Sequence, residues 1–84
     1  MKQEEINELL SRTTTNPGIF SGTPIIRDMR FRVADVLGYL AIGMTDDELL
    51  KDFPYLERKD IQACLMYASK KINHPVIQVN LDAA

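Results

Sequence analysis

The sequence predicts a mainly α protein in which three short helices share one core and the last two form a helix-turn-helix layout. An apolar residue precedes each expected helix start, and a second one follows five positions later, which is the spacing of a hydrophobic staple. These pairs are Phe31 and Val36, Met44 and Leu49, and Leu56 and Ile61. Pro54 disfavours helical backbone at Phe53, so the second helix has to end there and the third begins after a tight corner.

Residues 1–11 are expected to form an N-terminal helix. Ile6, Leu9 and Leu10 stand at helical spacing among acidic residues. A helix of this length is marginal in water by itself, so it has to dock on the rest of the domain to persist.

Residues 12–32 are expected to form a small β region. Arg12-Thr13-Thr14-Thr15 is rich in β-branched side chains, and Asn16-Pro17-Gly18 is a turn signal. Ile25-Ile26 then leads across Asp28-Met29, which predicts a tight hairpin.

Residues 33–72 are expected to carry the three-helix bundle. Gly43 can supply the left-handed residue that ends the first helix, and Thr45 can cap the second while Glu48 returns the hydrogen bond. The third helix is expected to bury one apolar face, made of Ile61, Cys64, Leu65, Ala68 and Ile72.

Composition predicts one small domain covering residues 1–84. With 45% hydrophobic and 26% charged residues, the chain has the balance of a soluble globular protein, and the first residues have no signal-peptide pattern, so we expect a cytoplasmic protein without a membrane span. A domain this small buries only about 60–65% of its unfolded surface, which favours a homodimer or a higher oligomer. The net charge of −2 argues against a generic nucleic-acid binder but allows a local basic face.

No pattern typical of an enzyme is present in the sequence, and no cofactor or metal is expected. The single cysteine, Cys64, falls on the apolar face of the third helix, where a packing role is expected. His74 has no Cys, Asp or Glu at metal-ligand spacing. No glycine-rich phosphate loop and no base-assisted nucleophile motif occurs.

Residues 12–70 resemble the bacterial family catalogued as domain of unknown function 433. Two segments carry the resemblance, in the expected order and separation: Gly22-Thr23-Pro24-Ile25-Ile26-Arg27 and Gly43-Met44-Thr45-Asp46-Asp47-Glu48. Further matches are Asn16-Pro17, Arg30, Val33, Leu37, Leu49, Pro54, Leu56, Asp60-Ile61, Ala63 and Tyr67-Ala68. The resemblance implies a homeodomain-like helix-turn-helix and an antitoxin of a bacterial toxin-antitoxin system, paired with a PIN-like ribonuclease toxin.

Two positions depart from the family pattern. Asp28-Met29-Arg30 stands where the family usually has Gly-Thr-Arg, which leaves the turn type of the hairpin open because a two-residue turn needs positive φ. Glu57 opens the third helix where the family favours Thr, and Glu is a poorer cap.

The third helix is the candidate recognition helix for operator DNA. Arg58, Lys59 and Gln62 are able to read base edges, and Lys70 is placed to meet phosphate. The alternative is an ordinary solvated helix face. Acidic residues at the start of the preceding helix, from Asp46 onward, oppose DNA there.

The β region is the most basic part of the chain. Arg27 and Arg30 are candidate phosphate contacts, because the guanidinium fork fits phosphate as well as carboxylate. The same arginines could instead hold a dimer interface by pairing with acids.

The C-terminal tail, residues 73–84, predicts a strand with one apolar face. Ile77, Val79 and Leu81 alternate with polar residues, and an isolated strand has to add to a sheet edge. The edge could belong to the chain itself, to a dimer mate or to a toxin, and these three residues are the candidate partner-binding residues.

Three hypotheses for function follow from these patterns and from what the family resemblance implies. The first is a dimeric antitoxin that binds operator DNA and neutralises a PIN-like toxin. The second is a protein-binding or dimerisation module without DNA binding. An undetected enzyme is the third and weakest alternative, because so small a chain has little room for a polar pocket.

Overall fold

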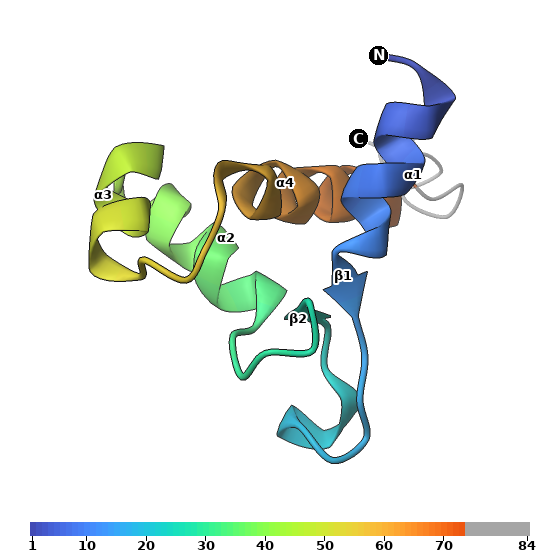
Figure 1. The fold of residues 1–84 in the computed structure, drawn as a ribbon, viewed down its shortest axis with the longest axis horizontal. Coiled ribbons are helices and arrows are strands. Elements are labelled where there is room, and N and C mark those ends of the chain that lie inside the picture. Colours follow the sequence, from blue (N-terminus) through green and yellow to red (C-terminus); the bar gives the residue numbers. More distant parts are fainter. Residues whose placement is uncertain (74–84) are drawn as a thin grey trace, which may run out of the picture.

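The longest helix, α4, lies at the centre of the computed structural model, which describes residues 1–73 (Figure 1). Within these residues the chain is mainly helical, with four α-helices and a small two-stranded antiparallel sheet, as the sequence predicts. The elements are α1 (Gln3–Ser11), β1 (Thr13–Thr14), the 3₁₀ turn η1 (Phe20–Gly22), β2 (Ile25–Ile26), α2 (Val33–Ala41), α3 (Asp46–Asp52) and α4 (Arg58–Ile72). The predicted strand with Ile77, Val79 and Leu81 lies outside the described residues.

The helices α1, α2 and α3 all pack against α4, with α1 at one end and α3 at the other (Figure 1). The core between α2, α3, α4 and the β region consists of Ile26, Phe31, Val33, Val36, Leu49, Leu56, Ile61 and Cys64. Phe31 and Phe53 make an edge-to-face contact, with ring centroids 4.9 Å apart, at the side of this core next to the turn that leads into α4.

Helix α2 ends and α3 begins as the local sequence predicts. Gly43 has φ +102°, its amide donates to the Leu40 carbonyl, and the Met44 amide donates to the Tyr39 carbonyl at 3.0 Å, which together form a Schellman ending. The Thr45 hydroxyl accepts from the Glu48 amide at 3.1 Å, and the Glu48 carboxylate accepts from the Thr45 amide at 2.9 Å. The predicted capping box is therefore confirmed.

The hairpin after β2 turns one residue earlier than predicted. The Met29 amide donates to the Ile26 carbonyl at 2.8 Å, so the central residues of the turn are Arg27 and Asp28, not Asp28 and Met29. Both have positive φ, +44° and +60°, as the type I′ turn requires. A left-handed conformation at arginine costs free energy, so another interaction has to hold Arg27 in place.

The predicted apolar face of α4 is wrong at two positions. Leu65 is 51% exposed and Ile72 is 64% exposed. The buried residues of α4 are Asp60, Ile61, Ala63 and Cys64, and at 100° per residue Leu65 falls on the margin of that arc. Ile72 lies in the last turn of a helix that is longer than the helices α2 and α3 that pack against it.

Candidate functional site

A buried carboxylate joins the β region to the start of α4. Asp60 is fully buried and accepts two hydrogen bonds from Arg27, at 3.0 Å from Nε and 2.8 Å from Nη2. It also accepts from Arg12 Nη1 at 3.0 Å and from the Glu57 amide at 2.8 Å. Its two oxygens are thus matched by two guanidinium groups and one backbone donor, which is what a buried charge needs.

Local structure brings these groups together. Glu57 precedes α4, and Asp60 is the third residue of that helix, so its carboxylate can return to the Glu57 amide. Arg12 follows α1 and also binds Glu8 Oε1 at 2.9 Å and Glu57 Oε1 at 2.7 Å. The Asp60 cluster, defined as Asp60, Arg12, Arg27 and Glu57, therefore links α1, the hairpin and α4.

The electrostatics of the cluster favour its charged state. Burial by itself raises the pKa of Asp60, but hydrogen bonds from Arg27, the Glu57 amide and Arg12 outweigh it and lower that pKa overall. Hydrogen bonds that Arg12 donates to Glu57 and Glu8 raise the pKa of Arg12, and the bond that Arg27 donates to Asp60 raises the pKa of Arg27. Asp60, Arg12 and Arg27 are therefore charged at neutral pH.

Arg27 and Arg58, two of the candidate DNA contacts, are engaged within the chain. Besides Asp60, Arg27 donates to the Tyr55 carbonyl at 3.0 Å. Arg58 binds Asp47 Oδ1 at 2.6 Å and lies 3.5 Å from Asp46 Oδ2. Exposed pairs like those of Arg58 contribute little to stability and can exchange partners, whereas freeing Arg27 would leave a buried carboxylate less satisfied.

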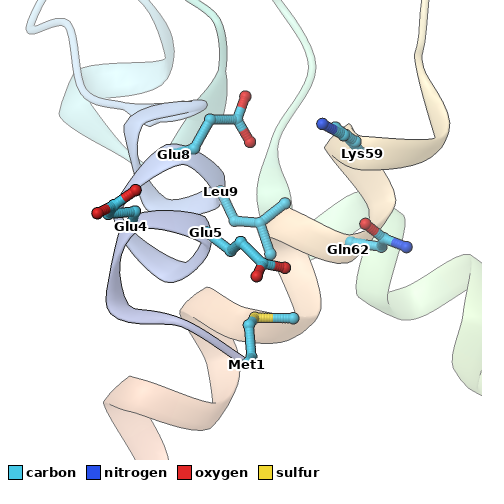
Figure 2. A pocket seen from close by; sticks show the side chains of 7 residues that line it. All are labelled: Met1, Glu4, Glu5, Glu8, Leu9, Lys59 and Gln62. Atoms are coloured by element: carbon cyan, nitrogen blue, oxygen red, sulfur yellow. The ribbon is translucent and has the colours of Figure 1, made fainter.

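Lys59 and Gln62, two further candidates, face α1. Together with Met1, Glu4, Glu5, Glu8 and Leu9 they line a hollow of about 240 Å³ between the two helices. Figure 2 shows Glu5, Glu8 and Leu9 on the side of α1 nearest α4, with Lys59 and Gln62 across from them. A phosphate approaching Lys59 or Gln62 would meet these carboxylates.

The last two candidates, Lys70 and Arg30, come from different parts of the fold. Both are exposed, and neither has an ion pair within residues 1–73. Lys70 is in the last turn of α4, while Arg30 follows the hairpin turn. Of the six candidate DNA contacts, Arg27 and Arg58 are thus engaged by acidic residues and Lys59 and Gln62 lie across from the acidic side of α1.

An apolar groove between α2 and α4 was not predicted from the sequence. It has a volume of about 290 Å³ and is lined almost wholly by apolar atoms. Its residues, called the α2–α4 groove below, are Thr23, Pro24, Val33, Ala34, Leu37, Tyr67, Ala68, Lys71 and Ile72. The sequence feature that could have indicated the groove is the small size of Ala34 and Ala68, which line it from two helices. Larger side chains at these positions would have filled the space.

The described residues offer little for metal or nucleophilic chemistry. Within residues 1–73 no group of three His, Cys, Asp or Glu side chains could hold a metal ion. Burial raises the pKa of the Cys64 thiol to about 12, so the thiolate needed for nucleophilic attack is scarce at neutral pH. Among the same residues, no helix has the length and apolar character to cross a membrane.

These features define a small, mainly helical domain in which a β hairpin is ion-paired to the longest helix. The chain belongs to the family described as Protein of unknown function (DUF433), whose model matches residues 14–68. That stretch includes Arg27 and Asp60 but begins after α1 and Arg12. The expectation from the two sequence segments is thereby confirmed.

One relative and one solved structure support this assignment. The uncharacterized protein y4eO of Sinorhizobium fredii (strain NBRC 101917 / NGR234) is 34% identical over 55 residues, which cover 66% of this chain and 25% of that protein. The match thus spans a quarter of that relative. The crystal structure of a DUF433 member from Anabaena variabilis ATCC 29413 is similar with a TM-score of 0.67 and 25% identity, over 98% of this chain and 86% of that one.

Proposed function

We propose that this chain is a protein-binding module of the antitoxin type, which acts by occupying a partner protein and not by catalysis. The observation that carries the proposal is the α2–α4 groove, an apolar surface concavity beside the exposed Ile72. Covering such a surface is favourable because apolar area leaves water.

The chemistry of the groove suits an amphipathic segment with an acidic flank. Lys71 is the one charged residue that lines the groove, and Lys70 precedes it in the same helical turn. An apolar side chain of the partner would fill the space above Ala34 and Ala68, while a carboxylate beside it would pair with a lysine. A PIN-like ribonuclease toxin is the partner that the family resemblance implies.

A matched pair of α4 variants tests the proposal. The full chain is titrated with the purified product of the adjoining gene as wild type, Ile72→Ser and Leu65→Ser. Ile72 lines the groove and Leu65 does not, although both are exposed on one helix. Since burying such a side chain is worth about 1.5 kcal/mol, Ile72→Ser should weaken binding roughly tenfold, with Leu65→Ser unchanged.

Equal losses in both variants, or no binding of that product by the wild type, would contradict the proposal. Ala34→Glu is a second groove variant, on an exposed α2 position that tolerates a helix former. It places a carboxylate where an acidic partner would dock, so it should weaken binding at least as much as Ile72→Ser. Circular dichroism would check that each variant keeps its helical content.

Operator DNA binding is the second candidate function. It is favoured by the short corner from Phe53 to Glu57, which joins capped α3 to α4, and by the exposure of Lys59, Gln62 and Lys70. The homeodomain-like arrangement, a homodimer and a cytoplasmic location belong to this proposal too. Gln62→Ala should then cost about 1–3 kcal/mol and relax sequence preference, as measured with promoter fragments at several salt concentrations.

A further inference from the structure

The acidic helix α1 lies along the part of α4 that a DNA backbone would have to approach. Leu9 is buried where α1 packs on α4, and Glu5, one helical turn earlier, shares its side of the helix (Figure 2). Glu8 lines the same hollow, with its Oε1 paired to Arg12 at 2.9 Å. Across the hollow, Lys59 and Gln62 are the nearest polar residues of α4 that line it.

The buried anchor of helix α1 lies near its C-terminal end. Leu9 is its single buried residue, and the adjoining Arg12 holds the Asp60 cluster. Its other end starts at Lys2, whose ammonium cannot accept a hydrogen bond from the first helical amides, and Met1 is 76% exposed. The cap there is a long hydrogen bond of 3.5 Å, which the Lys2 backbone amide donates to the Glu5 carboxylate. A weak cap and a single buried residue are the features of a helix end that opens at low cost.

We propose that the first two turns of α1, residues 3–8, act as an electrostatic shield that weakens binding of nucleic-acid phosphate to Lys59 and Gln62. This proposal rests on the second candidate function, operator DNA binding. It goes beyond that function because it makes the affinity for DNA depend on the position of α1. A polyanion binds well only when this end of α1 moves away or when its carboxylates are neutralised. The α2–α4 groove is formed by other residues, so partner binding there is independent of the shield.

The two neighbouring acids Glu4 and Glu5 supply a matched test. Both are exposed in the first turn of α1, so neutralising either one changes the net charge and the helix-dipole interaction alike. Glu5 also accepts from the Lys2 amide at 3.5 Å, and the side-chain oxygen of Gln keeps that acceptor. Both residues line the hollow, but Figure 2 shows the Glu5 carboxylate pointing to the α4 side and the Glu4 carboxylate pointing away from Lys59 and Gln62. Only Glu5→Gln should therefore act through Lys59 and Gln62.

The experiment measures binding of the full-length chain to a short fluorescent DNA duplex of mixed sequence at low salt, about 50 mM. Glu5→Gln should bind roughly fivefold more tightly than wild type, a size typical of one like charge removed at close range near a surface. Glu4→Gln should remain within about twofold of wild type because its carboxylate is more distant and screened. Adding Lys59→Gln to Glu5→Gln should abolish the gain.

Salt and the control variants decide the outcome. The gain from Glu5→Gln should disappear at about 0.5 M salt, where charges separated by more than a few ångströms are screened. Equal affinities for wild type, Glu4→Gln and Glu5→Gln would overturn the shield while leaving DNA binding in place. Failure of every variant to bind DNA at low salt would overturn both, and the titration of the groove variants would still test partner binding by itself.

Discussion

Arg27 forms a bidentate ion pair with Asp60. Its Nε donates to Oδ1 at 3.0 Å and its Nη2 donates to Oδ2 at 2.8 Å. The two residues are 33 positions apart in the chain. Arg27 is also the first central residue of the hairpin turn, with φ +44°. One residue thus combines a strained backbone with the interaction that offsets the strain, and it ties the hairpin to α4.

The first prediction concerns replacements of Arg27. Arg27→Ala removes the ion pair and keeps a Cβ at positive φ, so it should destabilise the fold by about 3 kcal/mol. Arg27→Gly loses the same pair but relieves the backbone, and should be about 1 kcal/mol less destabilising. Urea unfolding followed by circular dichroism measures both. Arg27→Ala at least as stable as Arg27→Gly would contradict the role given to the turn.

The second prediction concerns pH. The lowered pKa of Asp60 means that its contribution to stability is present above the unfolded value of about 3.9 and is lost as pH falls through the lower folded value. Wild type should therefore lose stability below about pH 5. Asp60→Asn should be less stable at neutral pH and should lose less on acidification.

Unfolding midpoints of wild type and Asp60→Asn at neutral and acidic pH are the measurement. Glu48 also has a lowered pKa, through its hydrogen bonds to Thr45, so the variant should keep a residual pH dependence. Parallel pH profiles for the two proteins would show that Asp60 has the same pKa folded and unfolded.

The third prediction concerns Cys64. Because the thiol is buried and its pKa is raised to about 12, a thiol reagent at neutral pH should label it only through unfolding. Labelling should be slow in buffer and fast in urea. Fast labelling of the folded protein would mean that Cys64 is accessible.

The fourth prediction concerns the start of α3. Thr45→Ala removes the hydroxyl that accepts from the Glu48 amide and should cost about 1 kcal/mol in thermal or urea unfolding. Ser69→Ala, at an exposed position of α4, is the control and should change stability by less than about 0.5 kcal/mol. Equal effects would show that the cap contributes nothing specific.

The features predicted correctly are those encoded over a few neighbouring residues. Gly43 predicts the end of α2 and the Thr45–Glu48 capping box predicts the start of α3, because both depend only on neighbouring residues. The structure has both features. The hairpin was placed one residue late because Arg27, a poor residue for positive φ, occupies the turn only through its distant partner Asp60. Local propensity contains no information about that partner.

The candidate site was harder to predict because it depends on how helices cross. Charge and helical spacing marked Lys59 and Gln62 as exposed, which they are, but could not reveal that α1 would bring Glu5 beside them. The α2–α4 groove has the same origin, since it exists only where two helices leave space between them. The spacing of Glu57 and Asp60, three residues apart at a helix start, was a usable signal for the cap at α4.

Chemical-shift mapping can locate the surface on which a partner protein binds, which we propose is the α2–α4 groove. The isotopically labelled full chain is titrated with the unlabelled product of the adjoining gene. The largest shift changes should fall on groove residues, Ala34, Leu37, Ala68 and Ile72, with little change at Leu65. Changes confined to Arg58, Gln62 and their neighbours, with the groove unaffected, would contradict this proposal.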